Sequence, residues 1–323
     1  MSSPIFIFSL PRSGSTLLQR ILSGSQDIST APEPWILLPF FSYENNISCY
    51  ANYSHNTYVT AMNELFSRCD ERKDFYYSSV RSGVSEFYDK LSDGKRYFLD
   101  KTPRYYLIAP SIVKAFPDAK YIFLWRNPAA IMSSISRTWL DSKWKMSTFE
   151  VDLYDGVESL VKTFQLDNKN FHSLRYEDLV KDPNTEITNL ERFLDLENGD
   201  LSTDIVQTKL FSKSALGDPT GLLEYSNKIS QDSLDRWKDE FKNNYRKKSG
   251  MNYLDWIGDE RLNIMGYDKS SLVSDIKNAP LKGGYINDYV DFFVDEVKCL
   301  LQSKVLKKSV SDRLNGVKGK RLD

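Results

Sequence analysis

The residues best suited to chemistry lie in a hydroxyl-rich segment near the start of the chain, Ser9–Thr16. A short apolar run precedes this segment and residues with helical spacing follow it, so we expect a strand, a loop and a helix in that order. A loop in that position directs backbone N–H groups and the positive end of the helix toward an anion. The hydroxyls of Ser13, Ser15 and Thr16 add donors. Arg12 adds a charged guanidinium, and the segment therefore predicts an anion-binding loop.

This loop departs from the G-x-x-x-x-G-K-[ST] pattern of nucleoside triphosphatases. Ser9 stands where that pattern has its first glycine, and Ser15 stands where it has its lysine. A loop without the lysine is poorly suited to a β- or γ-phosphate, although it still suits one terminal anionic group. An ordinary serine-rich turn is the alternative, and the strand–helix context opposes it.

A second basic candidate, Arg126, follows the apolar run Tyr121–Trp125. An arginine at the carboxyl end of a buried strand points into the crevice where doubly wound sheets bind ligands. Ser134 lies eight residues further on, about two helical turns into the next predicted helix. Arginine and serine together suit a phosphate monoester, but taken alone this pattern better fits a structural arginine that pairs with a carboxylate.

Short apolar runs predict the strands that position these residues. They are Pro4–Ser9, Tyr97–Asp100, Tyr121–Trp125 and Phe171–Arg175. Helical segments alternate with them, for example at about residues 106–116 and 185–194, and this alternation predicts a parallel sheet covered by helices on both faces. The predicted fold class is α/β, a doubly wound parallel sheet of the phosphate-loop type flanked by helices.

The chain is expected to form one large domain and a short extension. The domain covers residues 1–270 and contains a helical insertion at about residues 43–96, between the first two predicted strands. Residues 271–323 form a C-terminal helical extension, with an amphipathic helix from about 285 to 306 and a basic tail. Such a tail is more often a solvated, frayed end, and weak contact with an anionic membrane surface is the functional alternative.

The composition excludes several classes of protein. The 323 residues are 41% hydrophobic and 27% charged, which is typical of a globular protein with a buried core. The formal net charge of −1 leaves no overall field that would favour nucleic acid as a partner. No apolar run approaches the roughly 18–20 residues of a membrane span. Three cysteines without metal-type spacing, and no visible export signal, predict a cytoplasmic protein.

Four segments, in order, resemble the motifs of sulfotransferases that use 3′-phosphoadenosine 5′-phosphosulfate (PAPS). They are the 5′-phosphosulfate loop (Pro11–Leu18), the 3′-phosphate motif (Trp125–Pro128 with Ser134), the RYEDL segment (Arg175–Pro183) and the nucleotide-covering loop with its following helix (Gly217–Gly221 and Ser233–Trp237). Each motif alone is weak, but their shared order over about residues 4–240 is specific. The pattern is most similar to bacterial and protein-tyrosine-type members of that family.

The resemblance implies that PAPS is the co-substrate and that 3′-phosphoadenosine 5′-phosphate (PAP) is the product. The residues it assigns to the 5′-phosphosulfate are Arg12, Ser13, Gly14, Ser15, Thr16 and Leu17. It assigns the 3′-phosphate to Arg126 and Ser134, and it assigns Gly217 and Gly221 to the covering loop. It places Tyr176 against adenine, and a core aromatic residue after a strand is an equally good alternative.

The expected general base is a different residue from the one that the phenol sulfotransferases use. Their base is the histidine of a Lys-Thr-His motif, whereas this chain has Lys101-Thr102-Pro103. Protein-tyrosine and many bacterial members have a glutamate about 21 residues after the arginine of the loop, and that position is Glu33. Flanking prolines hold the backbone extended there. A surface glutamate in a loop is the alternative.

Lys101 matches the family lysine that stabilises the sulfonate and bridging oxygens, and Arg12 is expected to share that task. Asp100 ends a strand that also resembles a Walker B strand, whose aspartate helps to hold Mg²⁺. That feature favours a metal-dependent small-molecule kinase, which the missing loop lysine opposes. We therefore expect an enzyme that needs no metal.

The predicted reaction is in-line transfer of a sulfonate to a hydroxyl of a small molecule, a glycan or a lipid-linked acceptor. A nucleotide-binding module without catalysis is the non-enzyme alternative, and the presence of both Glu33 and Lys101 opposes it. Aromatic residues are frequent between Trp35 and Tyr58. We expect most of them in a small core and Trp35 at the acceptor.

Overall fold

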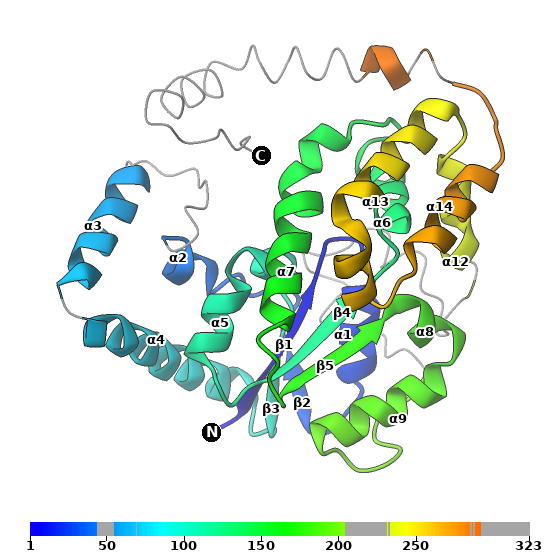
Figure 1. Ribbon diagram of the computed structural model, residues 1–323. Helices are drawn as coiled ribbons and strands as arrows, with labels where there is room; N and C mark the ends of the chain where they lie inside the picture. The colour runs from blue at the N-terminus through cyan, green and yellow to red at the C-terminus, as the bar shows by residue number, and fades with distance from the viewer. Residues whose placement is uncertain are drawn as a thin grey trace. The chain divides into compact units, whose positions relative to one another are not determined.

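The computed structural model describes residues 1–43, 55–68, 70–203, 231, 233–284, 286 and 288–291 (Figure 1). The chain divides into two compact units, which are described separately. The first comprises Met1–Trp125 and Glu158–Gln231, and the second comprises Arg126–Val157 and Asp232–Asp323. Within the described ranges, no helix has the length and apolar composition that a membrane crossing requires.

A five-stranded parallel sheet with the strand order β2-β3-β1-β4-β5 forms the centre of the first unit. The strands are β1 (Ser3–Ser9), β2 (Ile28–Thr30), β3 (Tyr97–Asp100), β4 (Lys120–Trp125) and β5 (Phe171–Arg175). The parallel order confirms the predicted α/β class, and all but β2 correspond to predicted strands. The sequence analysis missed β2 because so short a strand shows no recognisable alternation.

The register of the parallel strands aligns the carboxyl ends of β1 and β3 at one edge of the sheet. Ile5 of β1 lies opposite Leu99 of β3 and opposite Lys120 of β4. Since β1 and β3 are neighbours and run in the same direction, the loop after β1 and the residues after β3 leave the sheet at the same edge. The side chains of β1 and β4 are buried almost throughout, which explains their nearly continuous apolar sequences.

The first unit also contains helices, several of which flank its sheet (Figure 1). They are α1 (Ser15–Leu22), α2 (Leu38–Phe41), α3 (His55–Ser67), α4 (Asp70–Leu91), α5 (Ala109–Ala115), α8 (Tyr176–Lys181), α9 (Pro183–Leu194) and most of α7 (Gly156–Phe164). Helices α3 and α4 lie within the range of the predicted insertion, and α4 packs against β1 and β3. Residues 44–54 of that range lie outside the described residues.

The helix predicted at about residues 106–116 is divided in two. A 3-10 helix, η1 (Pro103–Ile108), precedes α5. Pro110 has no N–H, so it cannot donate to the carbonyl of Tyr106 as a continuous helix would require. The Tyr106 carbonyl instead accepts a hydrogen bond of 2.5 Å from Ser159 Oγ.

Helical segments make up the described part of the second unit. They are α6 (Pro128–Trp139), η2 (Met146–Phe149), η3 (Val151–Asp155), α12 (Ser233–Arg236), η4 (Trp237–Glu240), α13 (Asn244–Ile264) and α14 (Lys269–Asn278). The buried guanidinium of Arg246 joins α13 to η4 by pairing with Glu240 at 2.5 Å, and it also pairs with Asp288, after α14, at 2.7 Å. Most of the predicted C-terminal helix and all of the basic tail lie outside the described residues.

Candidate active site

The loop between β1 and α1 has the backbone conformation of an anion-binding turn. Arg12 and Gly14 both have left-handed φ angles, of 65° and 91°. The N–H of Ser13 bonds to the carbonyl of Leu10 at 3.3 Å, which closes the turn. A left-handed conformation costs a non-glycine residue such as Arg12 about 1–2 kcal/mol. Strain of this kind is concentrated at functional sites.

The N-terminus of α1 has donors available for an anion. Its N-cap, Gly14, has no side chain to bond the helix, and the first intrahelical bond runs from Leu18 N–H to the Gly14 carbonyl at 3.2 Å. The backbone N–H groups in the first turn of α1, before Leu18, have no acceptor within the helix. Ser13 Oγ is buried and has no hydrogen-bond partner among the described residues. A sulfonate or phosphate oxygen would satisfy these donors, so the loop fits the predicted nucleotide.

Tyr176 lies directly against this loop. Tyr176 is buried, with 4% of its surface exposed. A Cβ added at Gly14 would collide with its ring. Glycine at position 14 is therefore required twice, by the positive φ angle and by the aromatic ring. The family motifs place both residues at the nucleotide, but their contact could not be predicted because they are distant in the sequence.

Glu33 is a buried, paired carboxylate and not a surface residue. Its Oε1 lies 2.9 Å from Nζ of Lys101, and the two side chains are 8% and 2% exposed. The indole N–H of Trp35 donates to Oε2 of Glu33 at 3.2 Å. The structure thus brings the predicted base and the predicted sulfonate-binding lysine into direct contact. It also makes Trp35, itself 39% exposed, a hydrogen-bond donor to the base.

Asp100 is a buried hydrogen-bond acceptor. Asp100 is fully buried, with 0% of its surface exposed. Thr102 Oγ1 donates to Oδ1 at 3.0 Å, and the hydroxyls of Tyr88 and Tyr105 donate to Oδ2 at 2.5 and 2.9 Å. Burial raises the pKa of Asp100 from 3.8 to about 6, against the opposing effect of these hydrogen bonds and of Lys101. Both carboxylate oxygens accept hydrogen bonds from hydroxyls, which opposes the Walker B interpretation of Asp100.

Two of these hydroxyls also hold the segment that carries Glu33. Thr102 Oγ1 accepts the backbone N–H of Trp35, and the Tyr105 hydroxyl accepts that of Leu37, both at 3.1 Å. Each hydroxyl has one proton, which it gives to Asp100, so its lone pairs face the backbone N–H. Asp100 thereby orients two acceptors that fix the chain just after Glu33. The sequence offered only one signal of this network, the hydroxyl residues that closely follow Asp100.

The residues predicted for the 3′-phosphate lie in the second unit. Arg126 directly follows β4, and Ser134 lies in α6; both are buried. Asn127 starts this helix, because its side chain accepts the N–H groups of Ala129 and Ala130 at 2.9 and 3.4 Å. Gly217 and Gly221 lie outside the described residues. Within the described ranges, no group of three or more histidine, cysteine, aspartate or glutamate side chains has an arrangement that could hold a metal ion.

The sheet and the loop after its central strand define an α/β protein of the phosphate-loop type. A sequence profile of the sulfotransferase family matches residues 4–200. The chain therefore belongs to the sulfotransferase family, as its motifs predict, and it is a sulfotransferase. The kinase alternative and the non-catalytic alternative are wrong.

Similar proteins agree with this assignment. The nodulation protein NoeE of Sinorhizobium fredii (strain NBRC 101917 / NGR234) is 25% identical over 305 residues, which cover 82% of this chain and 66% of NoeE. A Caenorhabditis briggsae protein named "Putative protein-tyrosine sulfotransferase" is 23% identical over 278 residues, which cover 83% of this chain and 90% of that protein. The sulfotransferase domain from the curacin biosynthetic pathway shares the fold, with a TM-score of 0.52 and 24% identity over 80% of this chain and 98% of that domain.

Proposed function

We propose that this sulfotransferase transfers the sulfonate of PAPS to a hydroxyl of its acceptor and releases PAP. The observation that carries the proposal is the common edge at which the loop after β1, Glu33 after β2 and Lys101 after β3 leave the parallel sheet. An anion-binding loop, a buried cation and a buried carboxylate are the groups that sulfuryl transfer requires. All of them belong to the first unit.

Glu33 acts as the general base in this proposal. The acceptor oxygen forms a bond to sulfur while the bond from sulfur to the bridging oxygen of PAPS breaks, and the acceptor proton passes to the Glu33 carboxylate. Hydrogen bonds from Lys101 and Trp35 hold that carboxylate in place before the acceptor binds. A base held in one orientation reacts without first having to be ordered.

Lys101 stabilises charge on the sulfonate and on the leaving oxygen. An ammonium group has three donors, so Lys101 can contact Glu33 and a sulfonate oxygen together. Arg12 would add positive charge from the loop. The backbone of the loop and the hydroxyls of its serines and threonine would hold the 5′-phosphosulfate. Ser13 supports this role most directly, because its buried hydroxyl has no partner in the described residues.

The remaining nucleotide contacts are proposed from the family motifs. Arg126 and Ser134 bind the 3′-phosphate, and Tyr176 borders the adenine from its place against the loop. Gly217 and Gly221 form the covering loop. A sulfotransferase domain over residues 1–270, a C-terminal extension whose basic tail touches anionic lipid, and a location in the cytoplasm stay predictions.

Ligand-dependent thermal unfolding tests the nucleotide assignment. PAP at about 100 times its dissociation constant should stabilise the native state by about 2.7 kcal/mol. ATP, with or without Mg²⁺, should have a much smaller effect because the loop lacks a lysine for the γ-phosphate. Stabilisation by ATP with Mg²⁺ but not by PAP would contradict the proposal.

A further inference from the structure

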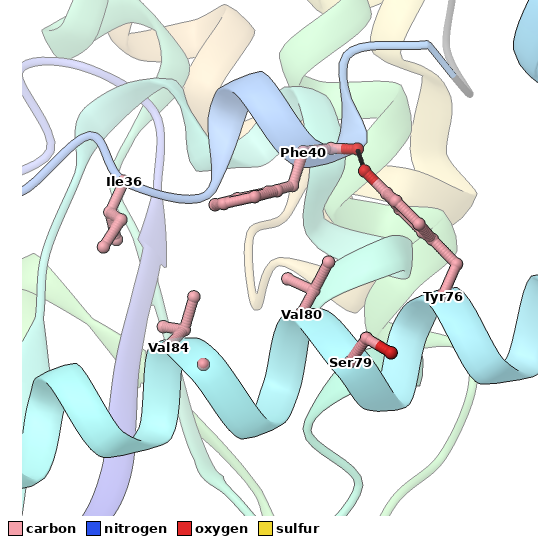
Figure 2. Close-up of a pocket in the computed structure, with 7 residues that line it drawn as sticks. Ile36, Phe40, Tyr76, Ser79, Val80 and Val84 are labelled. Atoms are coloured by element: carbon pink, nitrogen blue, oxygen red, sulfur yellow. Dashed lines mark hydrogen bonds between the residues drawn. The ribbon is translucent and has the colours of Figure 1, made fainter.

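A largely apolar cavity of about 420 Å³ lies between the segment that follows Glu33 and helix α4 (Figure 2). Ile36 and Phe40 face it from that segment, and Val80 and Val84 face it from α4. Figure 2 shows these four side chains converging on the cavity from the two elements. The cavity therefore has walls that fit an apolar group.

Among the described residues that line the cavity, few side chains are polar and none is charged. Tyr76 and Ser79 contribute its hydroxyls. The Tyr76 hydroxyl already donates to the carbonyl of Phe40 at 2.9 Å, an interaction drawn in Figure 2. A sugar or an anion would lose hydration here without gaining enough hydrogen bonds in return. An aliphatic or aromatic group would lose only unfavourable contact with water.

Gly83 marks this cavity as more than a packing gap. It lies within α4, a helix of 22 residues, and is one of the residues that line the cavity. A Cβ added at Gly83 would meet nothing within 4 Å, and its φ angle is not among the positive ones. Neither backbone conformation nor close packing requires glycine here, although glycine destabilises a helix by about 1 kcal/mol relative to alanine. Gly83 is itself exposed to solvent, so its structural consequence is open space on the solvent side of the cavity lining.

The cavity is also close to the proposed base. Ile36 is three residues after Glu33, so their Cα atoms lie within about 11 Å of each other even if the chain is fully extended. The hydrogen bond from Leu37 N–H to the Tyr105 hydroxyl fixes this segment. The backbone distance therefore allows a hydroxyl attached to an apolar group in the cavity to reach the Glu33 carboxylate.

We propose that this cavity binds the apolar part of the acceptor and that Gly83 sets the size of the group it admits. The substrate class is then an aliphatic or aromatic alcohol, or the apolar end of a larger hydroxyl compound. This inference rests on the proposed function, because it needs Glu33 as the base. It goes further by choosing among acceptors that the family motifs leave open.

Sulfotransfer rates with straight-chain primary alcohols, a naphthol and a free sugar test the inference. The wild-type kcat/KM should rise about fourfold per methylene until the cavity is filled. The Gly83→Leu variant should lose at least tenfold with the longer alcohols and the naphthol, mainly through KM, and little with the shortest alcohol. PAP binding should stay unchanged. The Ser82→Leu variant adds the same side chain at an exposed neighbouring position outside the cavity lining, and it should behave as wild type.

Other outcomes separate the inference from the function it rests on. Failure to bind PAP would contradict the proposed function itself. Turnover of the sugar but not of the alcohols, or losses that are equal in Gly83→Leu and Ser82→Leu, would overturn the inference and leave sulfotransfer intact. A changed oligomeric state in Gly83→Leu with unchanged KM would assign the cavity to a second copy of the chain and would also overturn it. If Gly83→Leu does not fold, Gly83→Ala should raise the melting temperature while it lowers kcat/KM for the longest alcohols, and an unchanged kcat/KM would refute the role of Gly83.

Discussion

Replacing Asp100 with asparagine should remove a defined part of the pH dependence of stability. The pKa of Asp100 is raised from 3.8 to about 6 in the folded protein, chiefly by burial. One pKa unit corresponds to about 1.36 kcal/mol, so the shift is equivalent to about 3 kcal/mol. Asp100→Asn keeps the size of the side chain and abolishes its titration.

The sign follows from the raised pKa. Below pH 3.8 Asp100 is protonated in both the folded and unfolded states, and its contribution to stability is fully present. As the pH rises through about 6, the unfolded state releases the proton more readily, so the contribution is lost. The difference in free energy of unfolding, wild type minus Asp100→Asn, should therefore fall by about 3 kcal/mol from acid to neutral pH. About 1.4 kcal/mol of this change should fall between pH 5 and pH 8.

Urea denaturation of both proteins at intervals from pH 5 to pH 8 measures this difference. Other titrating groups are common to the two proteins and cancel in the subtraction, so the slope reports Asp100. A difference that is constant over this range would refute the reasoning. A difference that rises with pH would mean that hydrogen bonding from the hydroxyls outweighs burial, and would equally refute it.

Two matched variants test whether Asp100 also positions the base. Tyr88→Phe and Tyr105→Phe each remove one hydroxyl donor to Oδ2 of Asp100, but only the Tyr105 hydroxyl also accepts the N–H of Leu37. We expect Tyr105→Phe to lower kcat on the order of 10- to 100-fold, because misplacing a catalytic group is costly. Tyr88→Phe should leave kcat close to wild type. Equal losses in kcat would indicate a purely structural role for Asp100.

Three further predictions concern the catalytic and nucleotide residues. Glu33→Gln should lower kcat about 10²–10⁴-fold with little change in PAP affinity. It should also lower the free energy of unfolding by about 3–5 kcal/mol, because the charge of Lys101 stays buried without its partner. A well-folded variant with near-normal kcat would exclude Glu33 as the base. Arg126→Ala should weaken PAP binding about 10- to 150-fold, and should weaken binding of adenosine 5′-phosphosulfate far less because that nucleotide has no 3′-phosphate; equal losses in titration calorimetry would contradict the assignment. Activity should survive an excess of EDTA, and a loss that Mg²⁺ restores would show dependence on a metal.

Local features of this protein could be predicted from its sequence. The strands, the anion loop and the helix after it depend on neighbouring residues, and so does the predicted helix at 185–194, which the structure begins at Pro183. Proline at the first helical position and an apolar run before a hydroxyl-rich turn act over a few residues. The same short range explains the error at residues 106–116, where the missing N–H of Pro110 divides the predicted helix.

The chemistry of the site depended on contacts between residues that are far apart in the sequence. The Glu33–Lys101 pair joins residues separated by 68 positions, and Tyr176 reaches Gly14 across most of the first unit. From the sequence alone, the position of Asp100 at the end of a strand indicates a candidate metal ligand. Only burial by the folded sheet, with hydroxyls supplied by α4 and η1, makes it an acceptor that orients the segment after the base. Residue types and spacing determined which groups were present, and tertiary packing decided what each of them faces, because burial and hydrogen-bond partners come from the whole fold.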